Sequence, residues 1–333
     1  MVVTLKDVAE LAGVSRSAVS RTYTEGASVS AKTREKVQKA ADDLGYSPNA
    51  LASSLTTGRT KMIGLVSNNF HNPIFLQVFD LFTKCLQDRG LRPLLVNLTD
   101  ETDPENSVRM LRQYSVDGVI VASSTLPESF AEAFRIAGVP VVHSFGRLTE
   151  NPTVNVLGID NKQAGRLAAE TLVARGYKSV GFLGGPEAAT STQDRMAGFL
   201  AALETHPDVQ CTASFASQYS FEAGRAEMLR LMDATLADAY FCGDDVLSVG
   251  ALSALQTRGL SVPDDVGIIG LNDMEMAGWD NINLTTIHNP IAEIIASSVN
   301  LVADIVQDHS IEPQARMFDC HVVDRGTLKP LKG

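Results

Sequence analysis

From about residue 60 onward, short apolar runs alternate with longer segments of helical spacing. KMIGLVSN, DGVIVAS, SVGFLGG and DVGIIGLND are rich in Val, Ile and Leu, and helical patterns such as NKQAGRLAAETLVARGY separate such runs. Strands that are apolar on both faces belong to parallel sheets that helices cover on both sides. Eight runs of this kind predict an α/β fold with enough strands for two parallel sheets.

Length and composition favour a soluble protein with more than one domain. A chain of 333 residues with 44% hydrophobic residues corresponds to about two domains and can bury a large core. The sequence has no apolar run of about 18 residues, and its start, MVVTLKDVAE, does not resemble a signal peptide. We therefore expect a cytoplasmic protein that does not contact membranes. The cysteines are Cys85, Cys211, Cys242 and Cys320, and they lack the spacing of metal ligands. We expect no metal and no cofactor.

The charge is distributed unevenly along the chain. Residues 1–61 hold nine Lys and Arg against six Asp and Glu, a net charge of +3. The remaining residues hold 19 basic and 33 acidic side chains, a net charge of −14. A basic end on an acidic body is typical of a protein whose one end contacts phosphates.

The stretch LKDVAELAGVSRSAVSRTY predicts two short helices joined by a turn at Gly13. In the second helix, Ala18 and Val19 face inward while Arg16, Ser17 and Arg21 point outward together. A second helix of this kind presents its side chains to the major groove in helix-turn-helix proteins, and the arginine fork can bind guanine O6 and N7. The alternative is a small helical hairpin with solvated arginines.

A third helix and a short, small-residue segment follow. Ser30 is placed to cap the helix in SAKTREKVQKAADDL, and ALASSL can form only a brief helix that is marginal without a partner. Several hydroxyl side chains are positioned to contact DNA phosphates without selecting a sequence. They are Ser15, Ser20, Ser28, Ser30 and Thr33.

DVAELAGVSRSAVSR, LGYSPNALASSL, GPEAATSTQDRMAGF and VPDDVGIIGLND resemble the lactose repressor (LacI/GalR) family of bacterial transcription regulators. The resemblance covers essentially the whole chain. It implies a helix-turn-helix headpiece, a hinge helix that enters the minor groove, and a core of two subdomains that resembles periplasmic sugar-binding proteins. The implied boundaries are 1–47 for the headpiece, 48–60 for the hinge and 61–333 for the core, with one subdomain at about 61–162 and 290–320 and the other at about 163–289 and 321–333.

The same resemblance implies the partners and the residues that contact them. The partners are a palindromic double-stranded operator, a small carbohydrate-like effector and a second copy of the chain in a homodimer. Arg16, Ser17 and Arg21 fall on base-contacting positions, and Asn49, Ala52 and Leu55 fall on hinge positions. The positions implied for effector binding are Asn72, Ile74, Phe75, Phe145, Arg195, Tyr219, Asp244, Asn272 and Asn289.

Physical chemistry indicates the same region for a ligand. Ligands of open parallel sheets bind beyond the carboxyl ends of the strands, where aromatic, amide, acidic and arginine side chains of this chain gather. Rings can cover the apolar faces of a sugar and paired polar groups can bind its hydroxyls. Three of these residues also have an interpretation other than effector binding. Phe75 could belong to the core, Arg195 could pair with Asp194 or another acid, and Tyr219 could cap a surface strand.

Two features depart from the family pattern. Many relatives have an amide at the position of Asp244 and an acid at that of Asn272, and this chain has the two types exchanged. Phe145 replaces the acid or amide of many sugar-responsive members. A standard hexose is therefore not assumed as the effector.

Other functional classes lack their signatures. The chain has no GxGxxG after a strand, no phosphate-binding P-loop and no GxSxG, so no enzyme activity is expected. His71, His143 and His288 lack the spacing of metal ligands. A periplasmic-type sugar-binding protein is the remaining alternative, but it does not account for the helix-turn-helix segment. The last predicted strand is MFDCHVVDRGTL, and only KPLKG follows it, which is too short for a coiled coil, so we expect a dimer rather than a tetramer.

Overall fold

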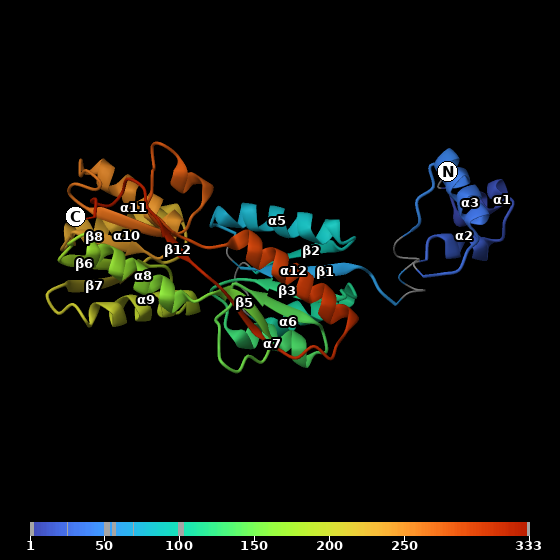
Figure 1. Cartoon of the computed structure of the whole chain (residues 1–333), viewed down its shortest axis with the longest axis horizontal. Helices are drawn as coiled ribbons and strands as arrows, with labels where there is room; N and C mark the ends of the chain where they lie inside the picture. Colours follow the sequence, from blue (N-terminus) through green and yellow to red (C-terminus); the bar gives the residue numbers. More distant parts are fainter. Residues whose placement is uncertain are drawn as a thin grey trace. The chain divides into compact units, whose positions relative to one another are not determined.

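The computed structural model describes residues 3–24, 26–49, 54, 58–68, 70–98 and 103–331. The chain separates into two compact units, residues 1–61 and 62–333 (Figure 1). Each unit has a hydrophobic core of its own.

The first unit contains α1 (Leu5–Ala12), α2 (Arg16–Thr22) and α3 (Ala31–Leu44), in the order that the sequence predicts. Gly13 ends α1 with φ of 63°, a left-handed conformation that favours glycine. The hydroxyl of Ser15 accepts a hydrogen bond from the amide of Ala18, and the hydroxyl of Ser30 accepts one from Thr33, both at 3.2 Å. These caps begin α2 and α3 where the sequence places them, which confirms the helix-turn-helix headpiece.

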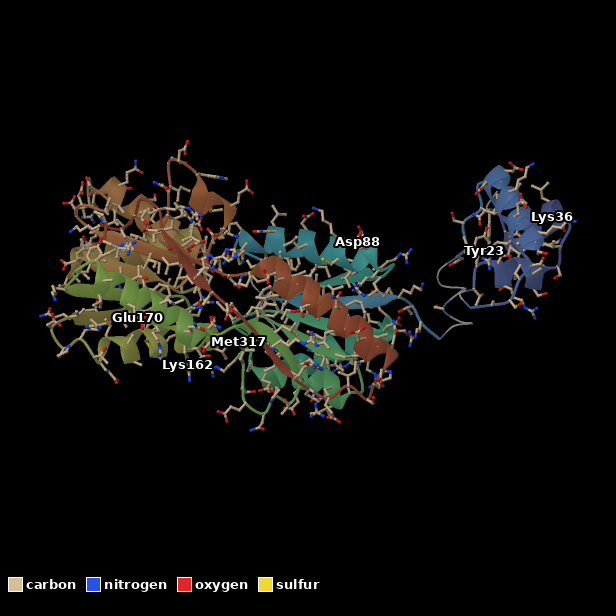
Figure 2. The ribbon with its side chains drawn as sticks, in the orientation of Figure 1. Tyr23, Lys36, Asp88, Lys162, Glu170 and Met317 are labelled. Carbon is tan, nitrogen blue, oxygen red and sulfur yellow. The ribbon has the colours of Figure 1, made fainter. Side chains whose placement is uncertain are left out.

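The headpiece core is small. Its fully packed side chains are Val8, Ala9, Val19, Val37, Ala40 and Ala41. The rings of Tyr23 and Tyr46 lie 6.2 Å apart beside this core, whereas Lys36 is exposed on α3 (Figure 2).

The first lobe of the second unit is a six-stranded parallel sheet in the order β11-β5-β4-β3-β1-β2. Helices α5 and α12 pack together on one face, and α6 and α7 pack together on the other (Figure 1). The strands are β1 (Met62–Ser67), β2 (Arg92–Asn97), β3 (Gly118–Ala122), β4 (Val141–Ser144), β5 (Asn155–Ile159) and β11 (Ala315–Phe318). The helices are α5 (Ile74–Asp88), α6 (Pro104–Gln113), α7 (Glu128–Ile136) and α12 (Ile291–Gln307).

The second lobe is a sheet in the order β12-β10-β9-β8-β6-β7, parallel except for the β10–β12 pair. The pair α8 and α9 covers one face and the pair α10 and α11 covers the other. The strands are β6 (Ser179–Gly184), β7 (Gln210–Phe215), β8 (Ala239–Cys242), β9 (Gly267–Asn272), β10 (Thr286–His288) and β12 (His321–Val323). The helices are α8 (Asn161–Ala174), α9 (Thr190–Leu203), α10 (Phe221–Asp233), α11 (Asp245–Thr257) and the short η1 (Glu275–Gly278).

Helices α8 and α9 cross at very short range because each presents a glycine. A Cβ on Gly198 would lie 1.9 Å from the Lys162 carbonyl oxygen, and a Cβ on Gly165 would lie 2.0 Å from that of Arg195. Any larger residue would force the helices apart. The first turn of α9 is therefore held firmly against α8.

The chain passes between the lobes three times: after β5, after β10 and between β11 and β12. Helix α8 begins at Asn161 and packs in the second lobe, two residues before the boundary that the sequence suggests. The stretch MFDCHVV forms two short strands in different sheets rather than one strand. All eight apolar runs become strands, so the α/β fold with two parallel-dominated sheets is confirmed.

Candidate functional site

A pocket with a cavity of about 40 Å³ lies where the two lobes face each other, at the carboxyl ends of their strands. All nine side chains that the sequence indicates for effector binding line it, together with three that it does not. The lining residues are Asn72, Ile74, Phe75, Val78, Ser124, Phe145, Arg195, Tyr219, Asp244, Asn272, Asn289 and Ile291.

The three additional residues carry signals that pattern analysis can detect. Ser124 follows β3 just beyond its carboxyl end, as the rule for ligand positions in parallel sheets requires. Val78 lies one helical turn after Ile74 on α5, and Ile291 begins α12 two residues after Asn289. Val78 and Ile291 are therefore near neighbours of predicted residues along the chain, whereas Ser124 follows from the strand-end rule alone.

Asp244 is the polar centre of the pocket. It caps α11 by accepting a hydrogen bond from the Val246 amide at 2.9 Å. Its other carboxylate oxygen accepts from the side-chain amides of Asn72 at 3.0 Å and Asn272 at 2.9 Å. Because Asn72 belongs to the first lobe and Asp244 to the second, this carboxylate joins the two lobes.

Burial controls the protonation of this carboxyl group. Asp244 is only 5% exposed, and loss of water raises the pKa of its carboxyl to about 6. The Val246 amide, the Arg195 guanidinium and the two asparagine amides act in the opposite direction. The next residue, Asp245, is fully buried, accepts from the Thr286 hydroxyl at 2.5 Å, and has its pKa raised by burial to about 7.

Asn272 and Asn289 continue the polar network toward the pocket. The Asn289 amide donates to the Asn272 side-chain oxygen at 3.1 Å. In the described part of the chain, the side-chain oxygen of Asn289 is buried without a hydrogen-bond partner. A buried acceptor without a partner is costly, so this oxygen is suited to a hydroxyl or amino group of a ligand.

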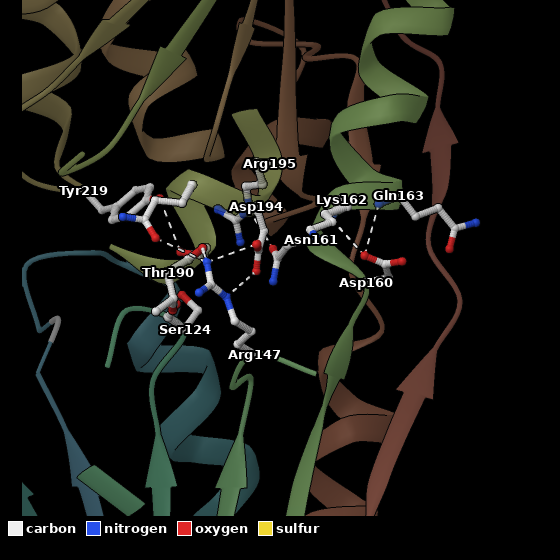
Figure 3. A network of polar contacts seen from close by, with 12 residues as sticks. Ser124, Arg147, Asp160, Asn161, Lys162, Gln163, Thr190, Asp194, Arg195 and Tyr219 are labelled. Atoms are coloured by element: carbon white, nitrogen blue, oxygen red, sulfur yellow. Dashed lines mark hydrogen bonds and ion pairs between the residues drawn. The ribbon is translucent and has the colours of Figure 1, made fainter. Parts of the chain in front are cut away.

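Arg195 supplies a buried cation on α9. It is 4% exposed, and it donates from Nε to the Asn161 side-chain oxygen at 2.8 Å and from Nη1 to the Gly243 carbonyl at 2.5 Å. Its sequence neighbour Asp194 instead forms an ion pair with Arg147 (Figure 3). The alternative that Arg195 pairs with Asp194 is therefore wrong. The guanidinium has five N–H donors, and its contacts with Asn161 and Gly243 engage two of its nitrogens.

Aromatic side chains form the apolar walls. Phe75 is 8% exposed and belongs both to the core of the unit and to the pocket lining. Its interpretation as a core residue is confirmed, and its contact with an effector stays a prediction. Phe145 adopts a φ of 66°, which is uncommon for a bulky residue. The backbone turns sharply at this residue, directly after β4. Tyr219 is 3% exposed and shares a 2.6 Å hydrogen bond with the Thr192 hydroxyl, so it does not cap a surface strand.

The histidines occupy different environments. His143 is buried with Nε2 3.0 Å from the Ser123 carbonyl, and burial lowers its pKa to about 4. His288 bonds to Asp273 at 3.0 Å, and His71 is exposed. Among the residues that the structure describes, no three His, Cys, Asp or Glu side chains are grouped as metal ligands.

In the headpiece, the base-contacting candidates Arg16, Ser17 and Arg21 are all exposed on α2. Among the candidate phosphate contacts, Thr33 is half-buried and the serines are exposed; they are Ser15, Ser20, Ser28 and Ser30. Asn49 is exposed, whereas Ala52 and Leu55 lie outside the described residues.

Comparisons with known proteins agree with both units. Residues 4–49 match the family model described as bacterial regulatory proteins, lacI family, and residues 169–328 match a periplasmic binding protein-like domain. The chain is 31% identical over 337 residues to the HTH-type transcriptional repressor PurR of Vibrio vulnificus, covering 98% of this chain and 99% of that protein. It is also 31% identical over 333 residues to PurR of Escherichia coli O139:H28, covering 98% and 96%. The chain belongs to the LacI family.

Solved structures of transcriptional regulators have a similar architecture. The Lac repressor dimer bound to operator and the anti-inducer ONPF matches with a TM-score of 0.86 and 27% identity, covering 98% of this chain and 99% of that one. The complex of the transcriptional regulator CelR with cellobiose matches with a TM-score of 0.72 and 28% identity over the same shares. Within the described residues, no helix is long and apolar enough to cross a bilayer.

Proposed function

We propose that this LacI-family regulator is a cytoplasmic, sequence-specific operator-binding protein whose affinity for DNA is controlled by a small polar effector. Exposure of Arg16, Ser17 and Arg21 on one helix supports direct contact with base edges. The exposed serines around them support phosphate contacts that orient the headpiece. The relatives' names as transcriptional repressors favour repression as the outcome.

One observation carries the effector part of the proposal: nine side chains from separate strand ends and helices meet in a single pocket between the lobes. The amides, the acid and the arginine match paired hydroxyl groups, and Phe75 and Phe145 offer apolar surfaces. This combination favours a carbohydrate or a carbohydrate derivative. The cellobiose complex of CelR is a precedent for this ligand class in a similar structure.

A thermal-shift screen tests the effector class. Sugars, sugar acids, polyols and, as an unrelated aromatic class, nucleobases are each added to the full chain. A ligand at 100 times its Kd stabilises the native state by about 2.7 kcal/mol, so a true effector raises the melting temperature. Stabilisation by nucleobases and by no polyhydroxylated compound would overturn the carbohydrate assignment.

We further propose a homodimer on a palindromic operator. Leu76 on α5 is 81% exposed and Leu95 on the edge strand β2 is 50% exposed, and these elements pack together in the first lobe. A second copy covering this side would remove both from water. Sedimentation equilibrium of the full chain is expected to give a dimer, and a stable tetramer would contradict the proposal.

The segment containing ALASSL is proposed as the hinge, with Asn49, Ala52 and Leu55 as its DNA-contacting residues. An apolar side chain inserted at a base step bends the duplex, and this contact forms only on the operator. Leu55→Ser is expected to weaken operator binding about tenfold while binding to scrambled duplex changes little, because that binding depends on phosphates. Equal losses on both duplexes would exclude Leu55 as the inserted residue.

A further inference from the structure

Arg147 connects the two lobes without lining the pocket. It follows β4 in the first lobe and contacts the first turns of α9 in the second (Figure 3). Its Nε and Nη2 donate to the two carboxylate oxygens of Asp194 at 2.7 and 3.0 Å. The same Nη2 lies 3.1 Å from the Thr190 carbonyl and 3.3 Å from the Gln193 side-chain oxygen.

This contact is stronger than an ordinary surface ion pair. The Asp194 side chain is 15% exposed and that of Arg147 is 37% exposed, so water screens the charges only in part. The planar guanidinium binds both carboxylate oxygens at once, which restricts direction as well as distance. Asp194 is therefore held in one orientation.

A second cross-lobe contact lies beside the first. Helix α9 begins after Ala189, which has no side chain that can cap it. Instead, the Ser124 carbonyl of the first lobe accepts from the Ser191 amide at 3.3 Å and from the Thr190 hydroxyl at 3.1 Å. The unsatisfied amides of a helix end need such acceptors, so the opposite lobe supplies part of the cap of α9.

The helix held in this way carries pocket residues. Arg195 follows Asp194 directly, and Thr192 supports the Tyr219 hydroxyl. Movement of α9 away from the first lobe would therefore displace the buried guanidinium and the aromatic wall together. Close packing against α8 makes α9 move with its lobe rather than alone.

We propose that Arg147 is a positioning residue that holds the lobes closed over the pocket by clasping Asp194, and that it thereby sets effector affinity. The second part rests on the proposed function, because it treats the pocket as the effector site. Closure itself has a readout that needs no ligand: the Ser191 amide is bonded to the other lobe, so opening exposes it to exchange with solvent.

Hydrogen exchange of the full chain measures closure in Arg147→Ala, Arg147→Lys and the charge-reversed pair Arg147→Asp with Asp194→Arg. We expect Ser191 to exchange about tenfold faster in Arg147→Ala, with an intermediate rate in Arg147→Lys, which keeps the charge but not the fork. The charge-reversed pair should recover most of the protection. Arg135→Ala is the matched control, because Arg135 pairs with Glu132 on its own helix.

Titration of the same variants with cellobiose and D-ribose tests the link to effector binding. Affinity for whichever sugar binds the unaltered chain should fall threefold to tenfold in Arg147→Ala and stay constant in Arg135→Ala. Unchanged exchange at Ser191 in Arg147→Ala would overturn the clasp, and altered exchange with unchanged affinity would overturn its control of the pocket. If neither sugar binds the unaltered chain, control of affinity for these sugars is refuted and the carbohydrate assignment is weakened, while the exchange rates still decide whether Arg147 holds the lobes closed.

Discussion

The headpiece and the pocket present their arginines in opposite ways. Arg16 and Arg21 are exposed on α2, whereas Arg195 is 4% exposed between the lobes. An exposed arginine keeps its hydration until DNA arrives, and salt screens its attraction to phosphates. A buried arginine has already lost its water, so each hydrogen bond that it makes or loses changes the free energy more. Substitutions at the pocket should therefore have larger effects than equivalent substitutions on the headpiece.

The largest effect is expected for Arg195→Ala. Loss of the buried guanidinium removes charged hydrogen bonds worth about 1.5–3 kcal/mol each, so effector affinity should fall about 100-fold while operator binding persists. Calorimetric titration with the best compound of the thermal-shift screen measures this. Arg166→Ala, on the exposed side of α8, is the control, and Arg195→Lys serves if the alanine variant unfolds. Unchanged affinity would remove Arg195 from the site.

Arg16→Ala should have the next largest effect, on operator binding alone. One bidentate base contact is worth about 1–3 kcal/mol, so affinity for the operator should fall about 30-fold at fixed salt. The thermal shift with effector should stay the same. Lys36→Ala, an exposed cation on α3, is the comparison. If Arg16→Ala weakens binding to the operator and to scrambled duplex equally, as is expected of Lys36→Ala, then Arg16 binds phosphate rather than bases.

A pH dependence is expected for the pocket and not for the headpiece. The Asp244 carboxyl has a pKa of about 6, so it is mostly ionised at pH 7 and mostly protonated at pH 5. If the ligand needs the ionised form, affinity should fall about tenfold between these values. Asp244→Asn should remove this dependence, and a slope that persists in the variant would assign it to another group.

The same shift predicts the direction of a stability effect. The pKa of Asp244 is higher in the folded chain than the ordinary value of 3.8, so the folded state binds a proton more tightly than the unfolded state. Its contribution to the free energy of unfolding is therefore largest below about pH 4 and is lost as the pH rises through 6. Burial raises the pKa of Asp245 to about 7, so its contribution to the free energy of unfolding is lost at a higher pH, as the pH rises through 7.

The smallest effects are expected for two matched helix caps, one exposed in the headpiece and one buried in the second lobe. Ser30 and Ser220 both accept from a helix amide at 3.2 Å, but Ser30 is exposed and Ser220 is 3% exposed. Water can replace the lost cap at Ser30, so Ser30→Ala should cost about 0.5–1 kcal/mol and Ser220→Ala about 2 kcal/mol. Hydrogen exchange in the first turns of α3 and α10 measures both. A larger loss at Ser30 would contradict the comparison.

Sequence patterns predicted most of the strands that are buried in the interior of a sheet, together with the edge strand β2, whose run LRPLLVNL is rich in leucine and valine. The three-residue strand β10 is buried but too short to give a pattern. The run KMIGLVSN became β1, in which five of the six residues are buried. Strand β7 was not predicted, because it lies at a sheet edge and half of its residues are exposed. The stretch MFDCHVV was predicted as one strand, whereas it forms the short, partly exposed strands β11 and β12. An edge strand need not show the continuous apolar run of a strand that is buried on both faces.

The pocket followed from the same rule together with the family resemblance, because residues at strand ends converge whatever the details of packing. The hydrogen-bond and ion-pair partners of the side chains in and beside the pocket could not be predicted from the sequence. That Asp194 binds Arg147, and that Arg195 binds Asn161, depends on how the two lobes face each other. Such contacts join residues 34 to 47 positions apart, and no local pattern encodes them.

The three passages between the lobes also constrain the order of assembly during synthesis. Helix α12 packs against β3, β4 and α5 of the first lobe, yet it follows almost the whole second lobe in the chain. Until residues 291–318 leave the ribosome, the first sheet lacks one covering helix and its edge strand β11. The apolar face that Ile294, Val299 and Val302 later cover stays exposed until then, so a nascent chain of this protein should depend on chaperones for longer than a chain whose domains are continuous.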